Sequence, residues 1–139
     1  MWHSESVIAL QLERLRRLAA SDFAAVAVRE QPDGRLRWAL ACGNRSERYK
    51  QMTLRPGIGP AGLALRTGMP VNWDDRSPPD TGALADCPLM AAEQLRCAAA
   101  FPVTRDDRPV SVVLLARRSN LPYTESDMRA ALHAIRSLP

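Results

Sequence analysis

Two pairs of short apolar segments, each pair separated by a turn sequence, most constrain what this chain can fold into. The first pair, Phe23–Arg29 and Leu36–Cys42, flanks Gln31-Pro32-Asp33-Gly34, and the second pair, Cys97–Val103 and Val110–Ala116, flanks Thr104–Arg108. A Pro-Asp-Gly sequence favours a tight chain reversal, and strand-length segments joined by a short turn pair antiparallel. The sequence therefore predicts two β-hairpins and, with them, a mostly antiparallel sheet.

Amphipathic helices are predicted near both ends of the chain. In residues 4–20 the apolar residues Ile8, Leu12, Leu15 and Ala19 recur at three- and four-residue spacing, and Ser4 is the expected N-cap. Thr124-x-x-Asp127 resembles a capping box and predicts the start of a last helix that extends to Leu138. Both helices need an apolar surface to cover, and the sheet provides one.

The middle of the chain predicts shorter elements. They are a helical turn within Gly43–Lys50, a strand at Met52–Leu54, a helix at Pro60–Arg66, a strand at Val71–Trp73, a loop at Asp74–Gly82 and a helix from Asp86 or Cys87 to about Leu95. Helices and hairpins in this order predict an α+β fold in which helices lie on the faces of a mostly antiparallel central sheet. No internal repeat or boundary divides the chain, so a single domain over residues 1–139 is expected.

Composition excludes several classes of function. The 139 residues are 46% hydrophobic, yet no segment approaches the roughly 18 apolar residues of a membrane span, and no signal-peptide pattern is present. The odd number of cysteines, three, argues against a disulfide framework and favours a cytoplasmic setting. The net charge of +4 comes from scattered arginines with only 5% aromatic residues, so neither a nucleic acid nor a membrane is an expected partner.

Catalytic and metal-binding patterns are also missing. The only histidines, His3 and His133, lie near opposite ends of the chain, far from the three or four convergent ligands that zinc needs. The pairs Asp74-Asp75 and Asp106-Asp107 lie in turns, where Asp satisfies local backbone groups. We therefore expect no catalytic residues, no metal and no enzymatic activity.

Two helix N-termini are the most informative feature for function. One follows Gly57-Ile58-Gly59 and the other begins near Cys87-Pro88, and a helix N-terminus offers free N–H groups to an anion without any cationic side chain. Tight turns before helices use the same residues, so this pattern alone leaves both interpretations open. Trp38 is either a core residue or a pocket wall. Cys87, at a helix start, is either a thiol of lowered pKa or a buried apolar residue, and Cys42 and Cys97 are expected in the core.

Together these segments resemble a GAF domain over nearly the whole chain. The motifs that carry the resemblance are Gly57-Ile58-Gly59-Pro60-Ala61-Gly62, Thr67-Gly68-Met69-Pro70-Val71, Ala100-Phe101-Pro102-Val103, Val112-Val113-Leu114-Leu115 and Tyr123-Thr124-Glu125. A narrower set is similar to the NreA nitrate receptors, and comprises Asp22–Ala27, Leu36-Arg37-Trp38, Gly43-Asn44, Arg48-Tyr49-Lys50, Leu54-Arg55, Cys87-Pro88-Leu89-Met90 and Ala92-Glu93.

The resemblance implies a GAF fold that binds nitrate or a similar small anion, with no other cofactor, in an apolar cavity over the sheet. The ligand-binding residues that it implies are Trp38 as a wall, Pro60, Ala61 and Gly62 at the first helix, and Cys87, Pro88 and Leu89 at the second. Because Pro60 has no N–H, the donors on its side are expected from Ala61 and Gly62. Cys87 replaces an aromatic residue of the family, which implies either a wider cavity or a change in the anion that is accepted. The implied partner is a sensor histidine kinase of the NreB type, in a nitrate/oxygen two-component system.

Two alternatives stay open at this point. A GAF domain without a ligand could serve as a dimerisation or interaction module, since the two terminal helices could extend into a homodimer. The enzyme alternative is free methionine-(R)-sulfoxide reductase, which needs thiols around its ligand pocket. The glycine-rich loop here has no cysteine, because it continues as Gly59-Pro60-Ala61-Gly62.

Overall fold

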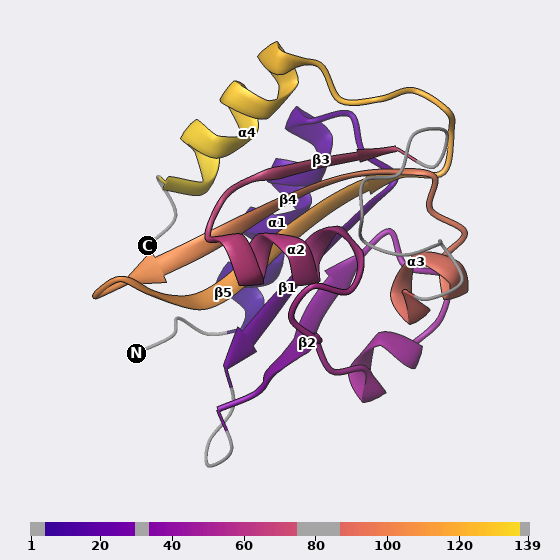
Figure 1. Ribbon diagram of the computed structural model, residues 1–139. Helices are drawn as coiled ribbons and strands as arrows, with labels where there is room; N and C mark the ends of the chain where they lie inside the picture. The colour runs from indigo at the N-terminus through magenta and orange to yellow at the C-terminus, as the bar shows by residue number, and fades with distance from the viewer. Residues whose placement is uncertain (1–4, 30–33, 75–86, 137–139) are drawn as a thin grey trace.

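The computed structural model describes residues 5–29, 34–74 and 87–136, and its strands form one five-stranded sheet (Figure 1). The strands are β1 (Phe23–Arg29), β2 (Leu36–Cys42), β3 (Val71–Asp74), β4 (Cys97–Arg105) and β5 (Arg108–Arg117). They are arranged in the order β2-β1-β5-β4-β3, and every neighbouring pair is antiparallel. The structure thus confirms the two predicted hairpins and the α+β class.

The β4–β5 hairpin turns over two residues rather than over the whole of Thr104–Arg108. Asp106 and Asp107 both have positive φ, 52° and 63°, which is the backbone of a type I′ turn. This turn matches the twist of the strands, so both strands extend further than the apolar pattern predicts. The turn of the first hairpin lies outside the described residues except for Gly34, whose φ is +74°.

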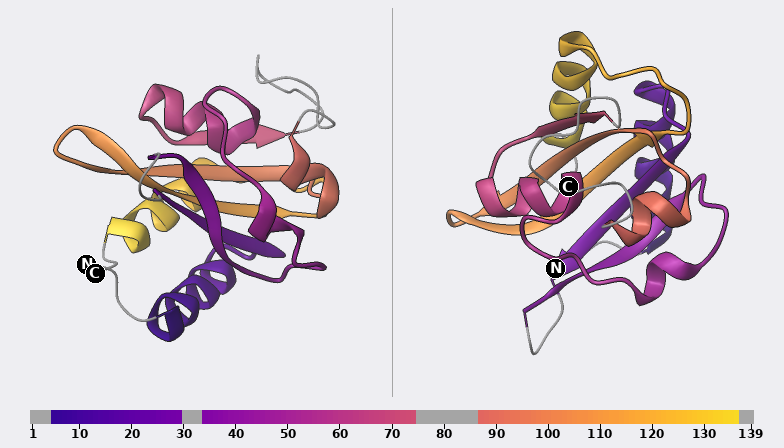
Figure 2. Two further views of the ribbon diagram at one scale, coloured as in Figure 1. Left: turned by 90° about the horizontal axis from the view of Figure 1, so that it is seen from below. Right: turned by 45° about the vertical axis from the view of Figure 1, so that its right-hand side comes forward.

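Helices α1 (Glu5–Leu18) and α4 (Glu125–Arg136) cover one face of the sheet (Figure 2). The predicted capping box forms at α4. The Thr124 N–H donates to Asp127 Oδ2 at 2.9 Å, and the Asp127 N–H donates to Thr124 Oγ1 at 3.0 Å. The predicted N-cap Ser4 and the predicted end at Leu138 lie outside the described residues.

The opposite face carries the 3-10 helix η1 (Arg48–Gln51) and the helices α2 (Gly59–Thr67) and α3 (Pro88–Ala92). Two predictions are corrected here. Met52–Leu54 forms a single β-bridge, Arg37 to Thr53, rather than a strand. Helix α3 ends at Ala92, well before Leu95, because Gln94 adopts a left-handed backbone with φ +56° as the chain turns into β4. Of the segment expected as a loop, only Asp74 is described, and it belongs to β3.

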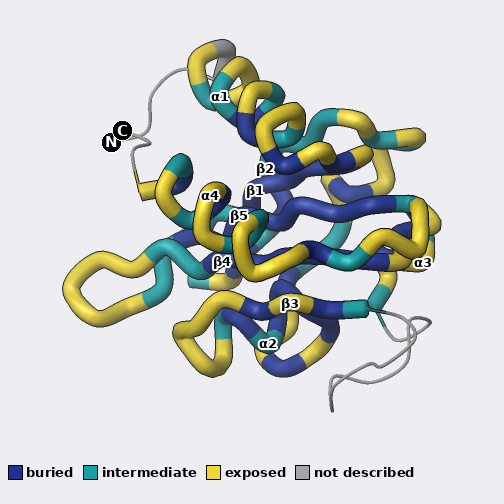
Figure 3. Tube along the Cα trace, turned by 90° about the horizontal axis from the view of Figure 1, so that it is seen from above, coloured by how far each residue is buried: buried dark blue, intermediate teal, exposed yellow. Residues whose placement is uncertain are grey.

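The central strands are buried on both faces, as Figure 3 shows. Successive residues of a strand point to opposite faces, so Ala25 of β1 and Leu114 of β5 pack on the face that carries α2, whereas Val26 and Leu115 pack on the face that carries α1 and α4. This two-sided burial explains why the strands are continuously apolar instead of alternating. Many of these inward positions are alanines, namely Ala24, Ala25, Ala27, Ala98, Ala99 and Ala100, all with 0% exposure.

A buried arginine holds the terminal helices to the sheet. Arg117, at the end of β5, is 4% exposed and donates to the carbonyls of Ala19, Ala20 and Leu121 at 2.9–3.1 Å. Its guanidinium also stacks on the Tyr123 ring, 4.0 Å from the centroid. These contacts join the end of α1 to the segment that leads into α4.

Candidate functional site

The glycine-rich loop before α2 is closed by backbone contacts that only glycine allows. The Gly57 N–H donates to the Gly62 carbonyl at 2.7 Å, and the Ile58 N–H donates to the Arg55 carbonyl at 3.1 Å. A Cβ on Gly62 would lie 2.2 Å from the Arg55 carbonyl oxygen, so a side chain there would force the loop open. Gly57 and Gly59 have φ values of +83° and +70°, in the left-handed region that glycine tolerates.

This loop sets which N–H groups at the start of α2 are free to bind an anion. Ile58 is the N-cap, and its own N–H is already used within the loop. Since Pro60 has no N–H, the first helical turn offers the N–H groups of Gly59 and Ala61. The helix starts one residue earlier than predicted, so Gly62 is its fourth residue, whose N–H falls within the regular helical pattern. The expected donor at Gly62 is therefore replaced by Gly59.

A cavity of about 300 Å³ lies between α2, α3 and the sheet. Its wall combines residues from β2, the segment after η1, the start of α2, the start of α3 and β5. The lining residues are Trp38, Gln51, Met52, Thr53, Leu54, Arg55, Ile58, Pro60, Ala61, Cys87, Pro88, Leu89, Met90 and Leu114.

Six of the seven residues expected to bind the ligand line this one cavity. They come from three places in the sequence and are Trp38, Pro60, Ala61, Cys87, Pro88 and Leu89. The seventh, Gly62, does not line it and instead packs against the Arg55 carbonyl. The fold thus brings β2 and the first residues of both short helices around a common space.

Trp38 forms a wall of the cavity from β2. Its backbone N–H donates to the Met52 carbonyl at 3.4 Å, beside the bridge between Arg37 and Thr53. The residue is 5% exposed, and its indole N–H donates no hydrogen bond to any of the described residues. Both interpretations of this tryptophan hold at once, because it belongs to the core and also faces the cavity. An indole N–H in such a place is a free hydrogen-bond donor.

Of the two interpretations of Cys87, the structure favours a largely buried side chain over a thiol of lowered pKa. Burial raises the pKa of its thiol, and the nearby backbone amides of Met90 and Leu89 offset this only in part. The sulfur lies close to α2, since a Cβ on Gly59 would be 2.6 Å from Cys87 Sγ. Cys87 is therefore a neutral side chain that closes the gap between the two helix starts. The amides of α3 lie beside its sulfur, which leaves α2 as the more open helix end.

Sequence reasoning missed the polar mouth and the apolar floor of the cavity. Gln51, at the end of η1, and Thr53 and Arg55, between η1 and α2, line it, and Gln51 and Arg55 are exposed. Met90 and Leu114 line it from below, at 0% and 1% exposure. The available signal was the position of Arg55 directly before the glycine-rich loop. The floor residues carry no such signal, because their direction depends on how β5 and α3 pack.

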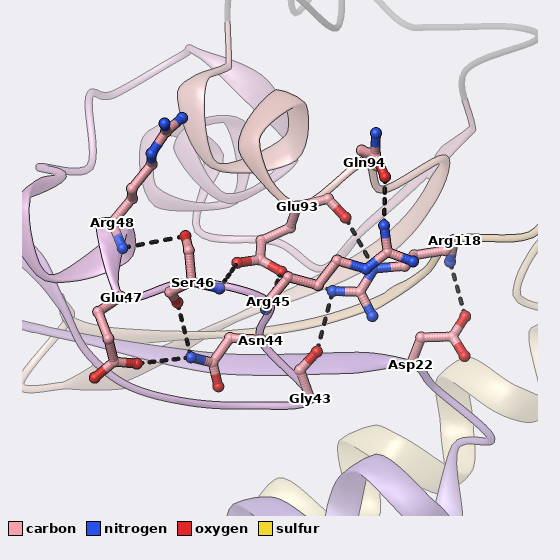
Figure 4. Close-up of polar contacts among 10 residues, drawn as sticks. All are labelled: Asp22, Gly43, Asn44, Arg45, Ser46, Glu47, Arg48, Glu93, Gln94 and Arg118. Carbon is pink, nitrogen blue, oxygen red and sulfur yellow. Dashed lines mark hydrogen bonds and ion pairs between the residues drawn. The ribbon is translucent and has the colours of Figure 1, made fainter.

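A buried carboxylate fixes the far end of α3 (Figure 4). Glu93 is 1% exposed and accepts hydrogen bonds from Arg118 Nη2 at 2.6 Å, from the Arg45 N–H at 2.8 Å and from the Ser46 N–H at 3.3 Å. Arg118 also donates to the carbonyls of Glu93 and Gly43 at 2.9 and 3.0 Å. Glu93 thereby connects α3 to the loop that leads into η1. Residues of α3 and of η1 both line the cavity.

The three thiols do not gather at the cavity. Only Cys87 lines it, whereas Cys97 is buried on the opposite face of the sheet, in the cluster formed with α1 and α4. Cys42 lies at the end of β2, only partly buried, and burial raises the pKa of its thiol to about 11. A reductase mechanism that needs several thiols around one ligand has no support in this arrangement.

Among residues 5–29, 34–74 and 87–136, no three His, Cys, Asp or Glu side chains gather in a way that could hold a metal ion. None of the helices described in those ranges is both long and apolar enough to cross a membrane.

Several solved structures are similar to this chain over most of its length. Similar solved structures include a mutated NreA protein, altered in its nitrate binding site, from Staphylococcus aureus, with 25% identity, a TM-score of 0.73 and coverage of 87% of this chain and 90% of that chain. A hypothetical protein from S. aureus is 27% identical, with a TM-score of 0.71 and coverage of 86% and 98%.

A type II free methionine-R-sulfoxide reductase from Thermoplasma acidophilum has 18% identity, a TM-score of 0.70 and coverage of 93% and 85%, a likeness of fold alone. No curated protein sequence matches the chain. The family model for the GAF domain matches residues 4–135, nearly the full length. The chain therefore belongs to the GAF domain family.

Proposed function

We propose that this GAF domain is a sensor that binds a small oxyanion, with nitrate as its ligand, in the cavity between α2 and α3. The observation that carries the proposal is the meeting of Trp38, the free N–H groups at the start of α2 and the apolar residues of α3 around one space. The similarity to NreA structures, at 25% identity over most of both chains, supports the same ligand class.

The chemistry of the wall suits a weakly hydrated anion. Arg55 is the one cationic side chain among the described lining residues, and it is exposed at the mouth. Apart from Arg55, binding therefore relies on uncharged donors, namely the Gly59 and Ala61 N–H groups and the Trp38 indole. Nitrate spreads one charge over three oxygens, so a few such donors at a positive helix end can replace its hydration shell.

The regulatory part of the proposal is that binding modulates a sensor histidine kinase of the NreB type in a cytoplasmic two-component system. The cavity lies on one face of the sheet, and the terminal helices α1 and α4 lie on the other. Helices on the face away from the ligand are available to a kinase or to a second copy of the chain. In this role the domain reports occupancy and catalyses no reaction.

Calorimetric titration of the purified domain with sodium nitrate, against sodium chloride at equal ionic strength, tests the proposal. Trp38→Ala should weaken nitrate binding. Trp38→Phe keeps a ring but removes the N–H, so its nitrate affinity should lie between those of the unmodified domain and Trp38→Ala. Leu89→Asp should abolish binding because it places a carboxylate in the cavity. The same change at Leu121, which is 62% exposed, is the matched control. Equal nitrate and chloride isotherms for the unmodified domain would refute the proposal.

A ligand-free dimerisation module is the second candidate. It is favoured by three exposed apolar residues on α1, namely Val7, Leu10 and Leu18, at 41%, 55% and 58% exposure. A domain with a ligand gains stability from nitrate beyond the effect of ionic strength. A module without one should show equal thermal midpoints in nitrate and chloride, and a dimer that Leu10→Glu dissociates.

A further inference from the structure

The cavity is larger than nitrate needs. A water molecule takes up about 30 Å³ in the liquid, so a cavity of about 300 Å³ has room for roughly ten such volumes. Nitrate has four heavy atoms and would occupy less than half of that space. The remaining volume needs another occupant, either water or part of a larger ligand.

The deep part of the cavity is unsuited to water. Its floor is formed by Leu89, Met90 and Leu114, at 2%, 0% and 1% exposure. Water retained in a cavity needs two to four polar partners, and the side chains of this floor offer none. With nitrate alone at the α2 start, the apolar floor would face either poorly bonded water or empty space.

The polar groups of the cavity are gathered at its mouth. Gln51, Thr53 and Arg55 line it there, and Arg55 makes no ion pair with any of the described residues. The Arg55 carbonyl accepts a hydrogen bond from the Ile58 N–H, which holds the backbone of Arg55 close to the start of α2. One end of the cavity thus offers a cation and free N–H groups, while the other end is apolar.

Resting on the anion site proposed above, we propose that the cavity also takes monocarboxylates with a compact apolar body, up to about ten heavy atoms, and binds them more tightly than nitrate. The carboxylate takes the place of nitrate near Ala61, Trp38 and Arg55. The apolar body fills the space over Leu89 and Leu114 and displaces water from it. Ligand pockets of this size are generally apolar with a few placed polar groups, which fits a ligand with two unlike ends.

A series of sodium salts tests this inference on the purified domain by calorimetry, with nitrate as competitor. Acetate has four heavy atoms, as nitrate does, 3-methylbutanoate has seven and phenylacetate has ten. Each buried methylene adds about fourfold in affinity. We therefore expect 3-methylbutanoate to bind at least tenfold more tightly than acetate. Phenylacetate should bind at least as tightly as 3-methylbutanoate, and nitrate should displace both.

A cavity-filling variant separates the two halves of the site. Leu89→Phe enlarges a side chain of the apolar floor, so it should lower the affinity for phenylacetate more than the affinity for acetate, and the gain along the series should be lost. Leu121→Phe makes the same change at an exposed position and should leave the whole series unchanged. If Leu89→Phe does not fold, Met52→Phe, on the partly exposed rim, tests the same difference in affinity.

The outcomes distinguish this inference from the proposed function. Nitrate binding together with equal affinities for acetate, 3-methylbutanoate and phenylacetate would overturn the inference and leave the nitrate proposal standing. Rising carboxylate affinities without nitrate binding would support the inference and refute nitrate as the ligand. Binding of none of these anions would overturn both.

Discussion

Replacing Glu93 with Gln should destabilise the domain strongly, because this carboxylate is buried and has three donors. Breaking a buried ion pair by removing one partner costs about 3–5 kcal/mol. Gln retains one acceptor oxygen, and Arg118 keeps two backbone carbonyls and remains 18% exposed. We therefore expect the free energy of unfolding to fall by about 2–3 kcal/mol. For a chain of this length the Tm should fall by about 6–15 °C.

Thermal unfolding followed by circular dichroism measures this effect, with urea unfolding as a check on the free energy. Glu47→Gln is the matched control, since Glu47 follows the same loop but its ion pair with Lys50 is exposed at both ends. The control should leave the Tm within error. In a double-mutant cycle, Glu93→Gln with Arg118→Gln should cost less than the sum of the single changes. A Glu93→Gln protein as stable as Glu47→Gln would refute the role given to this carboxylate.

Further perturbations test other parts of the structure. Hydrogen bonding from the Thr124 N–H lowers the pKa of Asp127, so its stabilisation is present above about pH 4 and is lost as the pH falls through the lower folded value. Asp127→Asn should lower the free energy of unfolding by about 0.5–1 kcal/mol at pH 7 and flatten the acid side of the profile of Tm against pH. An unchanged profile would show that the capping box does not cause the loss of stability in acid. Gly68→Ala, at φ +73° in open space, should lower the free energy of unfolding in urea by about 1 kcal/mol. Gly59→Ala also brings a Cβ against the Cys87 sulfur, so it should lower this free energy by at least about 1 kcal/mol more. Because burial raises its pKa, Cys87 should react with iodoacetamide more slowly in the native than in the unfolded chain at pH 8; equal rates by mass spectrometry would contradict its burial.

The elements that could be predicted from sequence are those that local chemistry determines. The hairpin strands were predictable because apolar segments and turn residues alternate along the chain. The capping box at Thr124 and Asp127 was predictable because its two residues lie within one helical turn and bond to each other's backbone. The same holds for the glycines before α2, whose backbone angles exclude most other residues.

The features that could not be predicted depend on contacts between distant segments. Helix α3 ends where Gln94 adopts a left-handed backbone, next to a buried Glu93 that bonds to Arg118 and to the loop after β2. A glutamate in a sequence is normally a surface residue, so this burial was not expected. Met52–Leu54 looks like a strand but reaches β2 over one bridge only. The floor of the candidate site at Leu114 depends on which face of the sheet the residue points to, and the strand pattern does not reveal this because both faces are buried.

The alanine-lined strands have a consequence for how the two faces of this domain communicate. An alanine has no side-chain rotamer, so the methyl groups of Ala98 and Ala100 toward α2, and of Ala24 and Ala99 toward the terminal helices, cannot absorb a displacement by turning a χ angle. Close-packed interiors are also poorly compressible. A shift of α2 against the sheet must therefore move strand backbone, and that movement reaches the layer formed by α1 and α4.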